Sequence, residues 1–574
     1  MNYTESYAYW LASAALTEDE KNELRAISGN DKEIESRFYG GLEFGTAGLR
    51  GMMGLGTARM NIHVIRHATR AFAEVILAEG PEFASKGIAI CYDCRNNSRE
   101  FARAAACVMA GSGIPVRIFS EMRPTPELSF AVRHYGCAAG LNVTASHNPK
   151  EYNGYKVYWS DGAQLPPNKA ALIKGRMEAN DVFAFGPGMD YDEAAAKGII
   201  TELGKETDDA FLECVMGEAT DYDTVASVAD SFKIVYTPFH GTGREMVPYV
   251  LRRLGIKNIY PVEEQMIPDG NFSTVASPNP ENPEGFALAI KLADRVGADF
   301  ILGTDPDTDR LGIMVRDRDG SFRPVSGNKT GVLLLDYVIG ARKRAGTMPE
   351  KPVALKTIVT TEMAREAAEN NGVRCFDTFT GFKFMAEKKN ALEAAGEGKV
   401  IFSYEESYGY MMGDYVRDKD AVTGSLVIAE MAAWYAARGM SLWDAIDELS
   451  GKYGFFDERT VNLYMPGLDG MERMAKVMES LRKDPPAEIA GTPVITRSDY
   501  LDGSCTDVRS GEKSEMELSG SNVLRFALSD GTVILARPSG TEPKIKVYVL
   551  ARGASAEECL KKLDEYGSWA ESLK

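Results

Sequence analysis

Histidine and cysteine are scarce in this sequence. Its 574 residues include five histidines and eight cysteines. So few histidines disfavour a histidine-rich zinc or iron centre, and eight cysteines in a chain of this length do not indicate a disulfide scaffold. Long apolar runs are also missing, since none approaches the ~18 uninterrupted apolar residues of a membrane-spanning helix. The first 16 residues contain no basic segment ahead of an apolar one, so no secretory signal is expected. We therefore expect a protein of the reducing cytoplasm.

Basic residues are also fewer than acidic ones. The chain carries 65 lysines and arginines against 83 aspartates and glutamates, a formal net charge of −18. This balance argues against nucleic acid or an anionic membrane as a partner. A chain with this charge that binds an anion must build a local cationic pocket. The hydrophobic content of 44% and charged content of 26% are typical of a globular protein, and the length predicts about four domains.

Apolar stretches alternate with helical patterns along most of the chain, which predicts α/β layers with largely parallel sheets. We expect strands at 87–92, 116–119, 138–143, 233–237, 299–302, 353–359 and 399–403, and helices at 98–110, 127–134, 245–254 and 362–370. The last part differs, with half-exposed strands at 461–464, 523–528, 532–536 and 545–550 and a helix at 556–573. The predicted domains are 1–205, 206–325, 326–455 and, as a smaller α+β domain, 456–574.

One short loop places three carboxylates at alternate positions. In Asp305-Pro306-Asp307-Thr308-Asp309-Arg310, a tight turn between two apolar runs would let the aspartates converge. Carboxylates held that close repel one another unless a cation lies among them, and oxygen ligands favour Mg²⁺ ahead of Mn²⁺ or Ca²⁺. The alternative is a solvated acidic turn. An EF-hand is excluded, because Arg310 stands where that loop needs glycine and Arg316 where it needs glutamate.

A second loop offers a nucleophile. Thr144-Ala145-Ser146-His147-Asn148-Pro149 follows a predicted strand, and no G-x-S-x-G elbow is present. Ser146 can carry a phosphoryl group whose charge a nearby Mg²⁺ would neutralise. Lys156 lies beyond Asn153-Gly154, where a turn can bring it back as a general base or acid. Taken alone, without the other loops, Ser146 and Lys156 fit ordinary surface positions better than catalytic ones.

Further loops follow predicted strands, where α/β sheets bind their ligands. The segment 537–544 combines Arg537, Ser539, Gly540 and Thr541 as a phosphate clamp would, although it is also good hairpin chemistry. Glu405-Glu406-Ser407 can bind sugar hydroxyls or be an exposed acidic turn, and 417–420 adds cations for a second anionic group. The glycines of 240–243 do not complete a dinucleotide fingerprint, because Met246 stands at the third glycine position.

Taken together, these motifs resemble the α-D-phosphohexomutase superfamily. The motifs TASHNP, DPDTDR, EES and RPSGTEPK stand in that family's order, and Gly45 to Gly51 resembles its first active-site segment. The length and the loop variants most resemble bacterial phosphoglucomutase/phosphomannomutase of the longer type. The resemblance implies a four-domain, heart-shaped architecture, with three related α/β domains of mixed sheets and a C-terminal α+β domain. It also implies an intramolecular phosphotransferase of the isomerase class.

The resemblance also implies roles for individual residues. Ser146 would be the phosphoserine and would join Asp305, Asp307 and Asp309 around one Mg²⁺ ion. The catalytic set would be Ser146, Lys156, Arg50 and His147. Substrate binding would fall to Arg310, Lys383, Glu405, Ser407, Arg417, Lys419, Arg537, Ser539, Gly540, Thr541 and Lys544. Some relatives carry a histidine in the third loop, whereas this chain continues Tyr408-Gly409-Tyr410, which leaves the second proton donor open.

The reaction implied is the interconversion of glucose 1-phosphate and glucose 6-phosphate. It would pass through a phosphoserine enzyme and glucose 1,6-bisphosphate, which is also the expected activator, with mannose phosphates as further candidate substrates. Two alternatives stay open: a mutase for ribose or deoxyribose phosphates, and a non-catalytic sugar-phosphate-binding relative. A simple phosphatase is a weaker rival. The expected partners are small sugar phosphates, with neither nucleic acid nor membrane, and the expected assembly is a monomer or homodimer.

Overall fold

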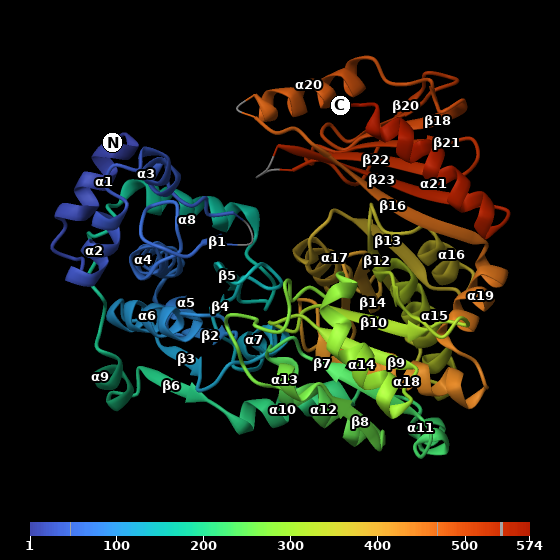
Figure 1. Ribbon diagram of the computed structural model, residues 1–574, viewed down its shortest axis with the longest axis horizontal. Coiled ribbons are helices and arrows are strands. Elements are labelled where there is room, and N and C mark those ends of the chain that lie inside the picture. Colours follow the sequence, from blue (N-terminus) through green and yellow to red (C-terminus); the bar gives the residue numbers. More distant parts are fainter. Residues whose placement is uncertain (46–47, 468, 540–542) are drawn as a thin grey trace. The chain divides into compact units, whose positions relative to one another are not determined.

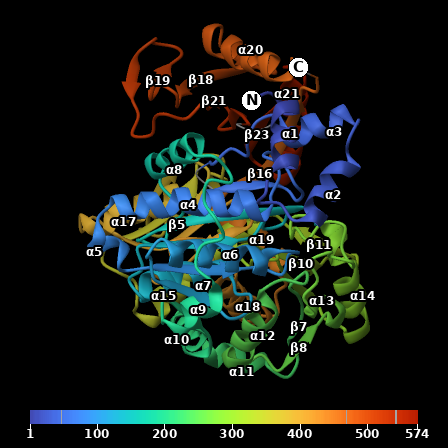
Figure 2. The ribbon, with the colours of Figure 1, turned by 90° about the vertical axis from the view of Figure 1, so that its left-hand side faces the viewer.

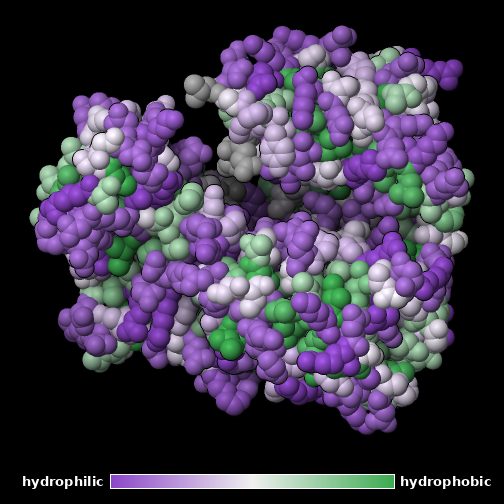
Figure 3. Space-filling model, viewed as in Figure 1, coloured by the Kyte–Doolittle hydropathy of each residue, from purple (hydrophilic) through white to green (hydrophobic). Residues whose placement is uncertain are grey.

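The computed structural model describes residues 1–574 except 46–47, 468 and 540–542. The chain divides into two compact units (Figure 1). The first comprises Met1–Val325 and Tyr408–Arg438, and the second Ser326–Ser407 and Gly439–Lys574. Hydrophilic residues dominate the face shown in Figure 3, and the apolar patches on it are small and separate.

A six-stranded mixed sheet forms the centre of the first α/β domain. Its order is β1 (Leu49–Met52), β5 (Tyr152–Trp159), β4 (Ala139–Val143), β2 (Ile88–Tyr92), β3 (Val116–Phe119) and β6 (Ile200–Leu203). The last four are mutually parallel, and β5 runs antiparallel to β4 and β1. Alternate residues of β2 enter different cores: Ile88 and Ile90 pack with α6 (Ser98–Gly111), whereas Ala89 and Cys91 pack with α7 (Thr125–His134). The two helices therefore cover opposite faces of the sheet.

Further helices complete this domain (Figure 2). They are α4 (Ile62–Ala78), α5 (Pro81–Ala84), α8 (Pro167–Ala179) and α9 (Tyr191–Ala196). Ahead of the sheet stand three helices that the sequence reading did not anticipate, α1 (Tyr3–Ala12), α2 (Glu18–Ala26) and α3 (Asp31–Phe38). Capping boxes start α1 and α2, at Asn2 with Glu5 and at Thr17 with Glu20. Buried Trp10 anchors α1 by edge-to-face contacts with Phe38.

A second α/β domain follows in the same unit. Its sheet has the order β11 (Phe322–Val325), β10 (Leu311–Arg316), β9 (Phe300–Thr304), β7 (Lys233–Thr237) and β8 (Asn258–Pro261). Its helical elements are α10 (Lys205–Met216), α11 (Tyr222–Val228), α12 (Gly243–Leu254), α13 (Glu263–Met266), η1 (Pro283–Phe286) and α14 (Ala287–Val296). The chain returns to this unit with β15 (Gly409–Met411) and α18 (Ala421–Ala437), which packs on α11 and α12.

The second unit contains a third α/β layer and the C-terminal domain. Parallel strands β13 (Arg374–Thr378), β12 (Pro352–Thr357) and β14 (Lys399–Glu405) stand with α15 (Gly327–Ala345), α16 (Met363–Glu369), α17 (Phe382–Ala394) and α19 (Leu442–Tyr453). The C-terminal sheet is antiparallel, in the order β16 (Phe455–Tyr464), β23 (Lys544–Gly553), β22 (Val533–Pro538), β21 (Leu524–Leu528), β18 (Thr492–Asp499), β19 (Ser504–Asp507) and β20 (Lys513–Glu515). The short strand β17 (Glu488–Ile489) pairs with β18, and helices α20 (Gly470–Lys483) and α21 (Ala556–Glu571) complete the domain.

The predicted fold class is confirmed: three α/β domains with mixed or parallel sheets precede a C-terminal domain with an antiparallel sheet. The domain boundaries at 205, 325 and 455 stay predictions. All eight cysteines are free thiols. Among the described helices, none combines the length and the apolar character needed to cross a bilayer.

Candidate active site

Ser146 lies in a tight loop that follows β4. Its φ of 50° is left-handed, and its backbone N–H donates to Thr144 Oγ1 at 2.8 Å. Behind the loop, buried Arg95 donates to the carbonyls of Ser146, Asn148, Pro149 and Tyr152. One guanidinium that binds several carbonyls holds the strained turn in place, because each bond is charge-assisted and shielded from water.

The aspartate loop is the hairpin between antiparallel β9 and β10. Asp305, Asp307 and Asp309 are buried, and one ligand oxygen from each lies within 4.8 Å of the others. Asp305 Oδ1 accepts from the backbone N–H groups of Asp309 and Arg310, while its Oδ2 accepts from Ser146 Oγ at 2.7 Å. The predicted convergence of the three carboxylates is therefore present, and Ser146 lies at the same point although it is 159 residues upstream.

Two lysines reach the same carboxylates. Lys156 Nζ donates to Asp307 Oδ2 at 2.7 Å and to Asp309 Oδ2 at 3.2 Å. Lys419 Nζ lies 3.2 Å from Asp309 Oδ2 and 3.1 Å from Asp418 Oδ1. The turn predicted at 153–154 is absent, because these residues lie within β5 and pair with β1. Lys156 is brought to the site by the antiparallel pairing of β5 with β4, which places it across from Asn142. Two buried ammonium groups therefore lie against the carboxylates of this loop.

The pKa values of the aspartates and of Lys156 are set by burial and by the charges of their neighbours. Burial and the neighbouring Asp307 and Asp309 raise the pKa of Asp305 well above its usual range. Burial opposes ionisation of Asp309, but Lys156 and Lys419 hold its pKa below the usual value. Burial likewise works against the charge on Lys156, yet Asp307 and Asp309 raise the pKa of that ammonium group.

The carboxylates fit a hard divalent cation. In the described part of the chain, Asp307 Oδ1 and Asp309 Oδ1 are buried without a hydrogen-bond partner, whereas the Oδ2 atom of each is occupied by lysine. Buried carboxylate oxygens that accept no hydrogen bond are costly unless a cation completes them. An oxygen-only donor set suits Mg²⁺, as the sequence predicts.

The remaining predicted residues of the first unit surround this cluster. His147 Nδ1 lies 3.1 Å from Ser146 Oγ, and burial together with Arg310 and Arg50 lowers the pKa of this imidazole well below its usual value. Arg50 donates to Asn148 Oδ1 at 3.0 Å, and Arg310 pairs with Glu281 at 3.0 Å while its Nε lies 3.8 Å from Asp309. Arg417 differs, because its guanidinium donates to the carbonyls of Asp414 and Val416 in its own loop.

Segment 240–243 supports the aspartate loop. Thr242 donates through its N–H to the Pro306 carbonyl at 2.8 Å, and its hydroxyl lies 2.8 Å from that of Thr308, whose φ is 56°. Gly241 is needed at this contact, because a Cβ there would lie 2.4 Å from Pro306 Cα. The glycines that looked like an incomplete dinucleotide motif therefore allow close packing against the turn, a role that their spacing did not reveal.

The other predicted residues belong to the second unit. Glu405 is the last residue of β14, and Ser407 follows shortly after it. Arg537 lies at the end of β22, next to Pro538. Ser539 N–H donates to the carbonyl of Lys544, the first residue of β23, at 2.9 Å. Gly540 and Thr541 lie outside the described residues. Burial and Glu406 raise the pKa of Tyr548 to about 12, while Arg537 opposes this rise. Burial lowers the pKa of Lys383 to about 8.

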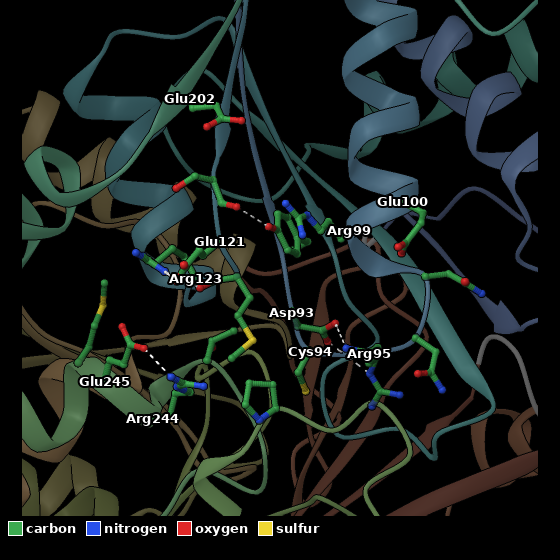
Figure 4. A pocket seen from close by; sticks show the side chains of 18 residues that line it. Asp93, Cys94, Arg95, Arg99, Glu100, Glu121, Arg123, Glu202, Arg244 and Glu245 are labelled. Carbon is green, nitrogen blue, oxygen red and sulfur yellow. Dashed lines mark hydrogen bonds and ion pairs between the residues drawn. The ribbon is translucent and has the colours of Figure 1, made fainter. Parts of the chain in front are cut away.

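A separate cavity of about 840 Å³ opens at the carboxyl ends of β2 and β3 (Figure 4). Its rim carries both signs of charge, with Arg99, Glu100, Arg244 and Glu245 at the starts of α6 and α12. Its wall includes Asp93 and Arg95, the same pair that holds the Ser146 loop. Sequence reading missed this pair, whose only signal is its position directly after β2.

Four family models match the chain in order. They are the phosphoglucomutase/phosphomannomutase α/β/α domains I, II and III at residues 41–183, 209–320 and 326–453, and the C-terminal domain at 473–563. A phosphoglucomutase from Staphylococcus aureus strain N315 is 35% identical over 539 residues, which cover 93% of this chain and 94% of the relative. One from Staphylococcus epidermidis is 35% identical over 511 residues, covering 88% and 90%.

Solved structures share the fold. A phosphoglucomutase/phosphomannomutase family protein from Burkholderia thailandensis has a TM-score of 0.64 at 20% identity, covering 92% of this chain and 97% of its own. Parafusin, a phosphoglucomutase from Paramecium, has a TM-score of 0.67 at 18% identity, covering 92% and 95%. The matched family domains and the phosphoglucomutase relatives show an intramolecular phosphotransferase of the isomerase class. The chain belongs to the phosphoglucomutase/phosphomannomutase family, and its activity is that of a phosphohexomutase.

Proposed function

We propose that this phosphohexomutase interconverts glucose 1-phosphate and glucose 6-phosphate through a phosphoserine at Ser146 and a glucose 1,6-bisphosphate intermediate. The observation that carries the proposal is the 2.7 Å contact between Ser146 Oγ and Asp305, inside a carboxylate cluster that two lysines reach. A serine placed there can hold a phosphoryl group among cations. The names of the staphylococcal relatives favour glucose phosphates.

The phosphoryl transfer balances over two half-reactions. In the first, the bond between Ser146 Oγ and phosphorus breaks, and a bond forms from phosphorus to the free sugar hydroxyl, whose proton passes to a base. The bisphosphate then presents its other phosphate, which returns to Ser146 while the freed sugar oxygen takes a proton. One Mg²⁺ ion held by Asp305, Asp307, Asp309 and phosphorylated Ser146 would neutralise charge on the transferring group.

The chain's own residues position these steps. We assign proton transfer to Lys156, with Lys419 as the candidate for the second donor, because both ammonium groups lie at Asp309. Arg50, His147 and Arg310 surround the serine. In the second unit we propose that Glu405 and Ser407 bind sugar hydroxyls and that Lys383 contributes specificity, as does Arg417 of the first unit. The distal phosphate would be bound by Arg537, Ser539, Gly540, Thr541 and Lys544.

Mannose phosphates remain a candidate second substrate. The activating role of glucose 1,6-bisphosphate, the monomer or homodimer and the cytoplasmic location stay predictions. A preference for pentose phosphates and a non-catalytic role are the alternatives, and the intact cluster of Ser146 with three aspartates counts against the second of these.

The test combines mass and rate. Intact-mass analysis after incubation with glucose 1,6-bisphosphate is expected to show one added phosphate, which Ser146→Ala removes. Turnover of glucose 1-phosphate is expected to fall by more than about three orders of magnitude in that variant, as for loss of a covalent nucleophile. Near-normal turnover in a folded Ser146→Ala protein refutes the mechanism. Faster turnover of ribose 1-phosphate by the unmodified enzyme refutes the glucose assignment alone.

A further inference from the structure

Thr125 joins the first α/β domain to the aspartate loop of the second. It is fully buried at the start of α7, between Pro124 and Pro126. Its backbone N–H donates to the Asp307 carbonyl at 2.8 Å, and its hydroxyl donates to Asp307 Oδ2 at 2.8 Å. The two residues are 182 positions apart. A backbone bond and a side-chain bond to one residue fix both its main chain and its carboxylate.

The direction of the hydroxyl bond follows from its neighbours. Asn142 in β4 donates its amide N–H to Thr125 Oγ1 at 2.8 Å. An ionised carboxylate can only accept, so the single hydroxyl proton of Thr125 goes to Asp307, and the amide of Asn142 fills the threonine oxygen. Asn142 also faces Lys156 across the β4–β5 pair. Both strands therefore contribute to holding Asp307. Lys156 of β5 contacts it directly, and Asn142 of β4 acts indirectly through its hydrogen bond to Thr125.

These contacts decide which carboxylate oxygen stays available. Asp307 Oδ2 accepts from both Thr125 and Lys156, whereas Asp307 Oδ1 is buried and has no hydrogen-bond partner within the described residues. With one oxygen doubly occupied, the carboxylate can offer a cation only the other. A rotation of the carboxylate would break both bonds in a buried environment, which is costly.

We propose that Thr125 is a positioning residue for the metal centre: its hydroxyl orients Asp307 so that Oδ1 alone is presented to Mg²⁺. This inference rests on the proposed metal site. Partners that orient a ligating carboxylate commonly change metal affinity 10- to 100-fold when removed, and we expect an effect of about tenfold here. Among the described candidate site residues, Thr125 is hydrogen-bonded to Asp307, so its effect acts through that carboxylate.

Magnesium affinity of the apo protein tests the proposal without an activity assay. The full chain is freed of metal with a chelator, and intact-mass analysis verifies that it carries no phosphate. The protein is then titrated with Mg²⁺ by calorimetry. Thr125→Val keeps the side-chain shape and removes the donor, and is expected to weaken Mg²⁺ binding about tenfold. Thr125→Ser restores the hydroxyl and is expected to bind within about twofold of the unmodified protein, which a merely space-filling role would not produce. Thr125→Ala replaces the valine variant if that protein does not fold.

The matched control is Thr69→Val. Thr69 is another fully buried threonine of the first domain: its hydroxyl donates to the Ile65 carbonyl within α4 and accepts from the Tyr155 hydroxyl. Unlike Thr125, it makes no hydrogen bond to an aspartate of the loop among the described residues. Its loss is expected to leave Mg²⁺ affinity unchanged. Unchanged affinity in Thr125→Val, or equal weakening in Thr125→Ser, overturns the role of Thr125 while leaving the metal site intact. Absence of Mg²⁺ binding in the unmodified protein overturns the metal site itself, and this inference with it.

Discussion

Lys156→Met removes the ammonium group that pairs with two of the three aspartates. The lysine side chain is only 5% exposed, and its Nζ lies 2.7 Å from Asp307 and 3.2 Å from Asp309. Methionine fills similar volume without charge. At an effective dielectric of ~20 the two contacts contribute about 6 and about 5 kcal/mol of Coulomb energy, offset by the cost of desolvating the charges. Breaking one side of such a buried pair typically costs 3–5 kcal/mol.

The cost should depend on Mg²⁺, because a divalent cation can replace the missing positive charge. We expect the apo variant to lose about 3–5 kcal/mol of unfolding free energy in urea. If Mg²⁺ binds the variant about tenfold more tightly than the unmodified protein, saturating Mg²⁺ restores about 1.4 kcal/mol of that loss. The assay is urea unfolding of both proteins with chelator and with Mg²⁺, following the transition of the first unit.

Lys389→Met provides the comparison. Lys389 is also fully buried and pairs with a glutamate, Glu393, at 2.8 Å, but it lies on α17 of the second unit. Its variant is expected to be destabilised equally with and without Mg²⁺. The reasoning fails if the deficit of Lys156→Met is the same in chelator and in Mg²⁺, because the aspartates would then not form a shared cation site.

Two further predictions concern a pH dependence and a close contact. Burial raises the pKa of Glu458 to about 7, so between pH ~4.5 and 7 the folded state keeps a proton that the unfolded state releases, and stability falls as the pH rises. Glu458→Gln should flatten this slope in pH-dependent urea unfolding and stabilise the protein above pH 7 by at most about 3 kcal/mol; an unchanged slope contradicts the assignment. Gly241→Ala places a methyl group against Pro306 and should cost about 1–3 kcal/mol and weaken Mg²⁺ binding. Gly175→Ala in α8, where no atom lies within 4 Å of the added carbon, should be neutral or slightly stabilising, and equal effects of the two substitutions would remove the special role of Gly241.

Much of the fold could be predicted because buried parallel strands leave a local signature. The segments predicted as strands at 116–119 and 233–237 coincide with β3 and β7, because a strand that is covered on both faces is mainly apolar. Their charged residues, Arg117 and Lys233, are the half-buried positions of the two strands. The aspartate loop was also predictable, because three acids at alternate positions constrain one turn. In contrast, α18 was missed: it is buried nearly all round, so it lacks the one-sided periodicity by which helices are identified.

The supports of the site could not be predicted for a different reason. Thr125 and Asp307 are 182 positions apart, and Arg95 acts through backbone carbonyls that carry no sequence information. Such contacts are properties of the folded chain, and no local pattern encodes them. The role of Lys419 as a substrate ligand stays a prediction; its ammonium group lies 3.2 Å from Asp309 Oδ2, a contact that the sequence did not indicate.

The guanidinium of Arg95 has a kinetic consequence. It secures the Ser146 turn by main-chain carbonyls alone, so the shape of the turn depends on neither a phosphoryl group nor a metal ion. Under the proposed mechanism, an enzyme that loses its bisphosphate before the second half-reaction is left dephosphorylated but not misshapen. A free bisphosphate molecule can then phosphorylate Ser146 again without a prior rearrangement of the loop. Recovery from a failed turnover is therefore limited by the binding of bisphosphate and not by a conformational change.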